Sequence, residues 1–353
     1  MRTRSPLTGQ GSRVRGWVAA PELAILLYAL LALDAARSAE RPVAWLALAA
    51  VPVALLLRRR PVALGVVLAL GGAWLRIAAL GIPETCDQLA VSRAALGPIL
   101  AGGSPWGIGY AASVPPGAPF PYGPLAVPAA LIGVPLEVAA MAGILLLLAR
   151  ERAVLSVALL GGWVGWVELG TCGINDQLPA FLLLAGLLLV ERGRRSGALL
   201  VGAGAAIKPY LLAWAPPLLG FGGVALAVPL LTATILLWLP ILSWGPARFL
   251  ASVEMARAIH PVSENALNVP VLRIVALPAA VLALRVRTWE TMVVAGCAIF
   301  AIVLFLDHWA SFGYWLVVLP LLGILGERRL RRTVDPSDGT APSVPYRGTR
   351  SSR

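Results

Sequence analysis

Long apolar stretches recur along the whole chain, and they constrain its fold more than any other feature. Each has about the length that a helix needs to cross the hydrocarbon core of a bilayer, and each carries few or no internal charges. Hydrophobic residues make up 59% of the chain and charged residues 13%, with a mean hydropathy of +0.82, which is outside the range of soluble domains. The sequence predicts an all-α polytopic membrane protein of about ten spans, at 17–37, 42–57, 61–81, 124–149, 153–169, 176–190, 224–242, 269–285, 289–306 and 310–326.

The segment between two of these spans has a different pattern. Residues 196–207 and 210–219 are apolar, but each piece is too short to span a bilayer at about 1.5 Å per residue. Lys208, the single lysine of the chain, lies between them and is followed by Pro209. Because the residue before a proline avoids the α conformation, we expect a broken or re-entrant helix pair with its break at Lys208.

The basic residues predict the orientation of the spans. The formal net charge is +12, and threading the chain through a membrane places every arginine cluster on one face. By the positive-inside rule this face is cytoplasmic, so both termini are inside and the excess charge reflects topology rather than nucleic-acid binding. The clusters are Arg2, Arg4, Arg13 and Arg15; Arg58, Arg59 and Arg60; Arg150 and Arg152; Arg192, Arg194 and Arg195; Arg285 and Arg287; and Arg328, Arg329, Arg331 and Arg332.

This topology predicts four parts for a multi-pass protein of the plasma membrane. Residues 1–16 form a basic cytoplasmic N-terminus and 17–60 an N-terminal transmembrane hairpin. Residues 61–326 form the main transmembrane domain, with a large outer loop at 82–123 and a second outer loop at 243–268. The polar tail 327–353 is expected to be cytoplasmic and disordered.

Candidate functional residues gather on the predicted outer face. Loop 82–123 begins with Glu84 and Asp87, continues with a short interfacial helix at 89–102, and ends in an irregular segment rich in proline, glycine and aromatic residues. Long loops in compact proteins are usually functional or disordered, and the aromatic residues favour function. The other candidates on this face are Arg93, Tyr122, Asn175, Asp176, Lys208, His260 and Glu264.

Several short motifs resemble a known enzyme class. The order DQLA (87–90), LAGGSPWG (100–107), PFPYGPL (119–125), GINDQLPAF (173–181) and GAGAAIKPYLL (202–212) resembles the polytopic C-superfamily glycosyltransferases. Within them the chain is most similar to glycosyltransferase family 87, the polyprenyl-phosphate-mannose-dependent mannosyltransferases. The resemblance implies transfer of a hexose, expected to be mannose, from a polyprenyl-phosphate donor to a glycolipid or polysaccharide of the cell envelope.

The resemblance also implies roles for particular residues. Asp87 matches the catalytic carboxylate, which acts as general base in an inverting single displacement, and Lys208 and Arg93 match cations around the donor phosphate. Glu84, Tyr122, Asn175, Asp176, His260 and Glu264 are weaker candidates for substrate binding. A displacement of this kind needs a base for the attacking hydroxyl and a stabilised leaving group, which a carboxylate and an ammonium supply.

Each of these residues also has a structural interpretation. Asp87 is well placed as the N-cap of the helix that follows it, and Asp176 can cap the span that it begins. Arg76 and Arg93 can extend to the membrane interface as snorkelling side chains. Glu137, inside a predicted span, has no cation partner that the sequence identifies, so it marks either a functional site or a local break near Pro135. For Lys208 the cost of burying a charge at membrane depth favours a functional role.

The cysteines and the remaining function classes leave alternatives open. Cys86 and Cys172 lie on predicted outer loops, where a disulfide is permitted, and a bridge and two separate thiols are equally consistent with the sequence. No metal-ligand motif is present, so we expect no metal site and no cofactor, with a divalent cation left open. The expected partners are the lipid-linked sugar, the acceptor and membrane lipids. The alternative functions are a transporter or flippase of lipid-linked sugars and a non-catalytic protein of envelope assembly.

Overall fold

The computed structural model describes residues 11–82, 86–259, 268–307 and 312–334. These residues are mostly helical, and their one sheet is a two-stranded hairpin, so the all-α prediction is confirmed. The chain divides into two compact units. Among the described residues, unit 1 comprises 11–79, 145–168 and 322–334, and unit 2 comprises 80–82, 86–144, 169–259, 268–307 and 312–321. The sequence placed a boundary at residue 60 instead, whereas α3 (Pro61–Ala79) packs with the helices before it.

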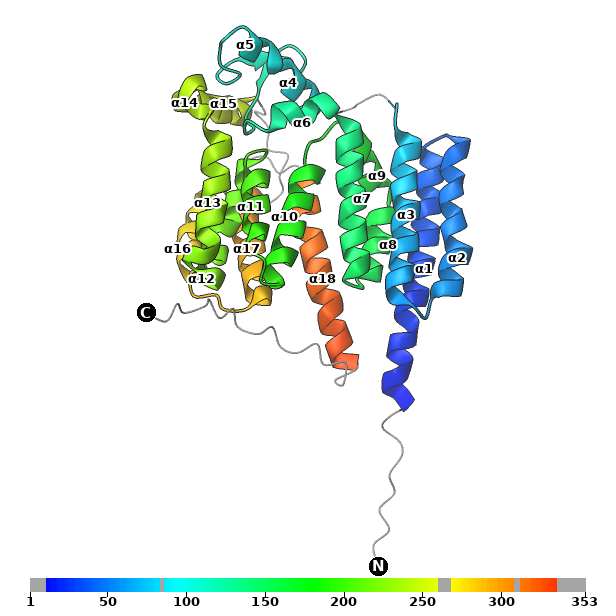
Figure 1. Ribbon diagram of the computed structural model, residues 1–353. Coiled ribbons are helices and arrows are strands. Elements are labelled where there is room, and N and C mark those ends of the chain that lie inside the picture. Colours follow the sequence, from blue (N-terminus) through cyan, green and yellow to red (C-terminus); the bar gives the residue numbers. More distant parts are fainter. Residues whose placement is uncertain (1–10, 83–85, 260–267, 308–311, 335–353) are drawn as a thin grey trace, which may run out of the picture. The chain divides into compact units, whose positions relative to one another are not determined.

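Unit 1 is a bundle of helices that lie side by side (Figure 1). Its elements are α1 (Gly11–Ser38), the 3-10 helix η1 (Pro42–Ala49) with α2 (Ala50–Leu57), α3, α8 (Val154–Gly162) and the adjoining parts of α7 (Val134–Arg150), α9 (Val164–Thr171) and α18 (Trp315–Val334). At the contact of α3 with α8, a Cβ atom on Gly72 would lie 2.6 Å from the Cα atom of Gly161. Glycine at both positions therefore permits the close approach of the two backbones.

Helix α8 is capped at both ends by side chains from distant parts of unit 1. At its start, the Glu327 carboxylate accepts hydrogen bonds from the backbone N–H groups of Leu155 (3.2 Å) and Ser156 (2.8 Å). At its end, Arg76 donates to the carbonyl oxygens of Leu160 (2.7 Å) and Gly161 (3.2 Å). Helix termini leave such groups without intrahelical partners, so each cap removes the cost of burying them unbonded.

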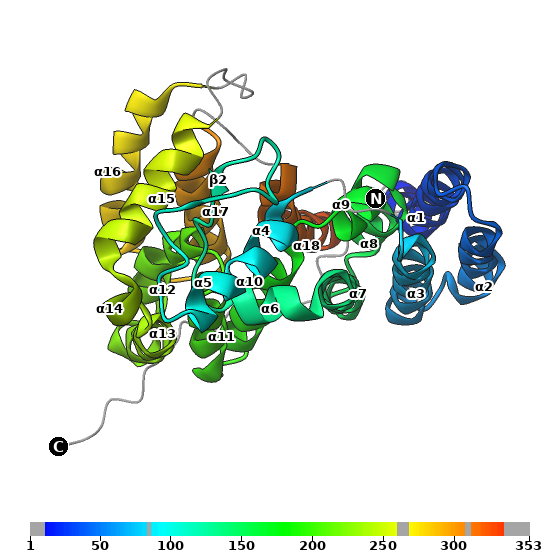
Figure 2. The ribbon, with the colours of Figure 1, turned by 90° about the horizontal axis from the view of Figure 1, so that it is seen from above.

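Unit 2 contains a layer of helices, and a cap of short elements lies over one end of this layer (Figures 1 and 2). The helical layer contains α10 (Gln177–Glu191), α11 (Ser196–Ala205), η2 (Pro209–Trp214), α12 (Ala215–Gly222), α13 (Val224–Trp238), η3 (Pro270–Val275), α16 (Ala276–Ala283), α17 (Trp289–Leu304) and η4 (Phe312–Tyr314). The cap contains α4 (Gln88–Ala94), α5 (Leu96–Leu100), β1 (Gly109–Tyr110), β2 (Ala118–Pro119), α6 (Ala126–Ile132), α14 (Ile241–Trp244) and α15 (Pro246–Ala258).

The large loop predicted at 82–123 is ordered where the structure describes it. Helices α4 and α5 lie where a short helix was predicted at 89–102, and β1 pairs antiparallel with β2, with Tyr110 opposite Ala118. The Ser113 hydroxyl holds the turn between the strands, since it donates to Tyr110 O at 2.7 Å and accepts from Ala118 N at 2.7 Å. The second loop was predicted at 243–268, and α15 occupies much of it.

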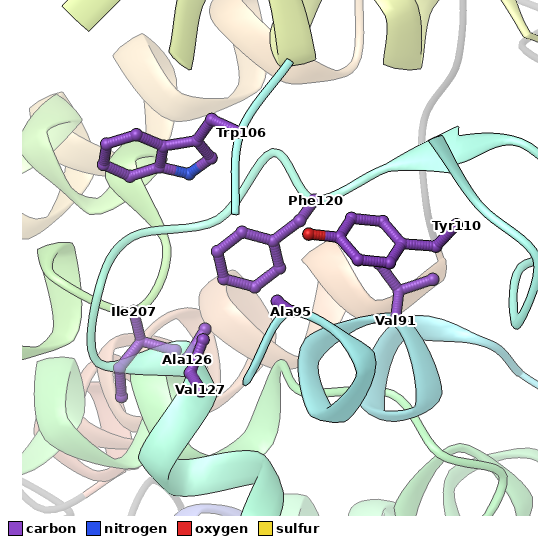
Figure 3. Close-up of a cluster of buried hydrophobic side chains, with 8 residues drawn as sticks. All are labelled: Val91, Ala95, Trp106, Tyr110, Phe120, Ala126, Val127 and Ile207. Atoms are coloured by element: carbon purple, nitrogen blue, oxygen red, sulfur yellow. The ribbon is translucent and has the colours of Figure 1, made fainter. Parts of the chain in front are cut away.

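Aromatic side chains of the large loop form a hydrophobic cluster under the cap of unit 2. Figure 3 shows Trp106, Tyr110 and Phe120 packed with side chains of α4 and α6 and with Ile207. Trp106 and Phe120 are fully buried, and Trp106 stacks 6.0 Å from Trp238 of α13. This burial fixes the loop against the helical layer, beside the residue that precedes Lys208.

Many of the predicted spans are interrupted in the structure. By length and composition, only α3 among the described helices is long and apolar enough to cross a membrane unbroken, and α6 and α7 pass the same test together but bend by 97°. The bend lies at Gly133, whose φ of 71° favours glycine, and 153–169 is divided at Trp163 into α8 and α9. The helices occupy the predicted positions, whereas a topology of ten spans stays a prediction.

The ends of the chain differ from their predicted boundaries. Helix α1 begins at Gly11, inside the segment expected to be a basic extension, and α18 continues to Val334, inside the expected tail. The remaining residues of both termini lie outside the described residues.

Candidate functional site

A cluster of buried polar side chains in unit 2 surrounds the single lysine. Helix α11 ends at Ala205, and Lys208 is extended, with φ of −126° and ψ of 106°, immediately before the 3-10 helix that begins at Pro209. The predicted break at Lys208 is therefore confirmed. The side chain is only 4% exposed, so its charge requires partners within the protein.

Two side chains from different segments bind the Lys208 ammonium. The Nζ atom lies 3.2 Å from Asp176 Oδ1 and donates to Gln88 Oε1 at 3.1 Å. It also lies 4.3 Å from the centroid of the Tyr122 ring, a cation–π contact. An ammonium group has three N–H donors. The groups around this one are a carboxylate, an amide and an aromatic face.

Asp176 belongs to this cluster and does not cap the helix that it precedes. It occupies the N-cap position of α10, but its side chain makes no capping hydrogen bond. Its Oδ1 atom instead accepts from the Tyr210 hydroxyl at 2.6 Å, in addition to its ion pair with Lys208, while Oδ2 is buried without a hydrogen-bond partner. The sequence allowed Asp176 to be either a helix cap or a site residue, and in the structure its side chain belongs to the site.

Glu137 supplies the cap that Asp176 does not. Its carboxylate accepts from the backbone N–H groups of Gln177 at 2.9 Å and Leu178 at 3.1 Å, both in the first turn of α10. Glu137 is 2% exposed and comes from the first turn of α7. A carboxylate at a helix N-terminus satisfies unpaired N–H groups and is favoured by the helix dipole.

Asp87 lies beside this cluster but has a different environment. It precedes α4 without capping it, and its Oδ2 atom accepts from the backbone N–H of Val114, in the turn of the hairpin, at 2.8 Å. The residue is partly exposed, whereas Asp176 is completely buried. The N-cap interpretation of Asp87 is therefore not what the structure has.

Tyr122 lies near both carboxylates, those of Asp87 and Asp176. Burial raises the pKa of its phenol well above the ordinary value, and the negative charges of Asp176 and Asp87 raise it further. The residues that follow Tyr122 are hydrogen-bonded to the segment just before Lys208. Gly123 N donates to Ile207 O at 2.9 Å, and Leu125 N donates to Ala206 O at 3.0 Å. The phenol therefore stays protonated at neutral pH, with Asp87, Asp176 and Lys208 around it.

The structure brings some predicted site residues together and leaves others apart. Tyr122 and Asp176 both contact Lys208, and Asp87 is near enough for its charge to affect Tyr122. Asn175 adjoins the cluster through its backbone N–H, 3.4 Å from Gln88 Oε1. The amide nitrogen and oxygen of the Asn175 side chain are buried without hydrogen-bond partners. Arg93 is exposed and donates to Leu89 O of its own helix at 3.3 Å, a contact that favours the structural interpretation. Glu84, His260 and Glu264 lie outside the described residues.

Sequence reasoning missed two side chains of the cluster, Gln88 and Tyr210, and the role of a third, Glu137. Gln88 and Tyr210 are neighbours of Asp87 and Lys208 in motifs that were already singled out, so the adjacency was the available signal. The role of Glu137 had no such signal, because it depends on the position of α7 against α10. Cys86 and Cys172 are both thiols in the structure, and the backbone N–H of Cys86 donates to Cys172 O at 2.6 Å.

Comparison of the chain with protein-family models, with curated proteins and with solved structures finds no match. The arrangement of the site residues is therefore the basis for assigning a function.

Proposed function

We propose that this protein is a multi-pass membrane glycosyltransferase that moves a hexose from a polyprenyl-phosphate donor to an envelope glycolipid or polysaccharide. The main support for the proposal is the pairing of a desolvated ammonium with a nearby, partly exposed carboxylate. Lys208 is 4% exposed, and its ammonium donates to the side chain of Gln88. Asp87 directly precedes Gln88 in the chain. These two groups match the two requirements of a displacement from phosphate, a cation at the leaving group and a base at the nucleophile.

In the proposed reaction Asp87 acts as the general base. Its carboxylate takes the proton of the acceptor hydroxyl while that oxygen bonds to the anomeric carbon, and the bond from this carbon to the donor phosphate oxygen breaks. The incoming and leaving oxygens occupy opposite faces of the sugar, so the configuration inverts. Asp176 is a poorer candidate for this role because it is fully buried and its Oδ1 atom already binds Lys208 and Tyr210.

Lys208 is assigned to the departing phosphate. An ammonium in a site of low dielectric interacts strongly with an anion, and Asp176, 3.2 Å from the ammonium nitrogen, is the anion beside it before the donor binds. The ammonium also contacts the ring of Tyr122 through a cation–π contact rather than a hydrogen bond, and we propose that a phosphate oxygen binds the ammonium in place of this ring. We propose that this cluster lies on the outer face, where polyprenyl-phosphate sugars rather than cytoplasmic sugar nucleotides are available.

A comparison of two Asp-to-Asn variants in membranes tests the proposal. We expect Asp87→Asn to abolish transfer from polyprenyl-phosphate mannose while the protein still accumulates in the membrane, because the amide cannot accept the proton. Asp34→Asn, at an exposed position of α1, is the matched control and should retain wild-type transfer. Wild-type rates in Asp87→Asn would remove Asp87 from the mechanism.

A transporter of lipid-linked sugars is the second candidate, and the interrupted helices favour it. Discontinuous helices with charged residues at the break are typical of transporter binding sites, and Lys208 lies at such a break. In liposomes that contain the purified protein, a transporter would move polyprenyl-phosphate mannose between leaflets without forming a glycosylated product. Formation of product by the purified protein would favour the transferase.

A further inference from the structure

Two cysteines lie at the base of the candidate site, and the main chain holds them together. Cys86 directly precedes Asp87, and Cys172 lies in the segment that leads to Asn175 and Asp176. Cys86 N donates to Cys172 O at 2.6 Å, and Leu89 N donates to Gly173 O at 2.8 Å. A direct main-chain hydrogen bond places two Cα atoms about 5 to 6 Å apart, which is within the range that a disulfide bridges.

The thiols themselves are also in contact. A hydrogen bond with Cys86, in which the Cys172 thiol is the donor, together with burial raises the pKa of Cys172 above its ordinary value. Cys172 is 7% exposed, whereas Cys86 is partly exposed and therefore the more accessible of the two. The third cysteine, Cys297, lies buried in α17.

We propose that Cys86 and Cys172 form a disulfide that clamps the two polar segments of the site to each other. One segment carries Asp87 and Gln88, and the other carries Asn175 and Asp176. Lys208 bonds to both segments, through Gln88 at 3.1 Å and Asp176 at 3.2 Å. A disulfide between Cys86 and Cys172 therefore restrains the distance between Asp87, the proposed general base, and the ammonium of Lys208.

The bond forms by exchange with a partner that itself carries a disulfide. The Cys86 thiolate attacks one sulfur of the partner disulfide and releases the other as a thiolate. The Cys172 thiolate then attacks the Cys86 sulfur in the mixed disulfide and releases the second partner sulfur as a thiolate. The two protons given up by Cys86 and Cys172 pass through solvent to the two partner thiolates, and two electrons reduce the partner to its dithiol form. Cys86 makes the first attack because it is the more accessible thiol.

Peptide mapping of the purified full chain tests the bond directly. After incubation with oxidised glutathione, alkylation and tryptic digestion, we expect peptides 77–93 and 153–192 to be recovered as one cross-linked species that separates on reduction. Recovery of both peptides as alkylated thiols from the folded, oxidised protein would overturn the proposal. This result does not depend on any enzymatic activity.

Thermal unfolding tests the clamp with a matched control. We expect oxidised wild type to melt roughly 5 °C above reduced wild type, since a cross-link restricts the unfolded chain. The difference should persist in Cys297→Ser and disappear in Cys86→Ser and in Cys172→Ser. An equal difference in all of these variants would contradict the assignment of the bond to this pair.

The effect on activity rests on the proposed transferase function, and its failure can be distinguished from failure of the bond. We expect faster sugar transfer by the oxidised than by the reduced protein, with no such difference in Cys86→Ser. Equal rates in the two wild-type forms would overturn the clamp as a determinant of the site. Cross-linking and a melting shift without transfer in any form would support the bond and contradict the transferase.

Discussion

Among the residues whose burial the structure describes, each of the two units buries one strongly basic side chain, and the groups that bind the charge differ between the units. In unit 1, Arg76 is fully buried and donates to the carbonyl oxygens of Gly72, Leu160 and Gly161. In unit 2, Lys208 is bound by the side chains of Asp176 and Gln88 and by an aromatic ring. Backbone carbonyls keep one protonation state, whereas the carboxylate of Asp176 can gain a proton. The comparison therefore separates a structural cation from one suited to chemistry.

The largest expected effect is on stability, at Arg76. Arg76→Met leaves the carbonyl oxygens at the end of α8 buried without donors, and we expect a loss of about 3 to 5 kcal/mol in the free energy of unfolding. Arg58→Met, at an exposed side chain of the same unit, is the control and should change stability by less than about 0.5 kcal/mol. Denaturant unfolding in detergent measures both, and equal stabilities would contradict a structural role for Arg76.

The second prediction concerns rescue at Lys208. Lys208→Met leaves the buried Asp176 carboxylate without its cation and should cost about 3 kcal/mol. Adding Asp176→Asn removes that charge, so the double variant should regain about 2 kcal/mol of stability but none of the transfer activity. For Arg76, whose acceptors are backbone atoms, no side-chain substitution can produce a comparable rescue. A double variant as unstable as Lys208→Met would show that Asp176 is not the partner that matters.

The third prediction tests the division of labour between the two acidic residues near α10. Glu137→Ala removes the acceptor for Gln177 N and Leu178 N and should cost about 2 kcal/mol. Glu137→Gln retains an acceptor oxygen and should cost about half as much. Unfolding of the two variants compares them, and an equal loss would indicate that the charge, rather than the cap, is what Glu137 contributes.

The smallest effect is expected at Tyr122. Tyr122→Phe keeps the ring over Lys208 and should change stability by less than about 0.5 kcal/mol, whereas Tyr122→Leu removes the cation–π contact and should cost about 1 kcal/mol. Comparison of the two melting curves isolates the ring from the hydroxyl. A larger loss in Tyr122→Phe than in Tyr122→Leu would point to the hydroxyl instead.

The sequence predicted the parts of this site that depend on local rules. The break at Lys208 follows from Pro209, and the positions of the helices follow from the apolar stretches. Arg76 was expected to snorkel to the interface, and that was wrong, because its acceptors belong to a helix 84 residues further along the chain. Glu137 was likewise unassigned, because the N–H groups that it caps are 40 and 41 residues away. Long-range partners of this kind have no local pattern.

Donor affinity distinguishes a lysine that binds the donor phosphate from one that only holds unit 2 together. The measurement is equilibrium binding of polyprenyl-phosphate mannose to purified wild type and to the folded Lys208→Met/Asp176→Asn double variant, which separates binding from stability. We predict a Kd at least about tenfold higher in the double variant, equivalent to about 1.4 kcal/mol. Equal dissociation constants would contradict phosphate binding by Lys208 and would place it with Arg76 among the structural cations.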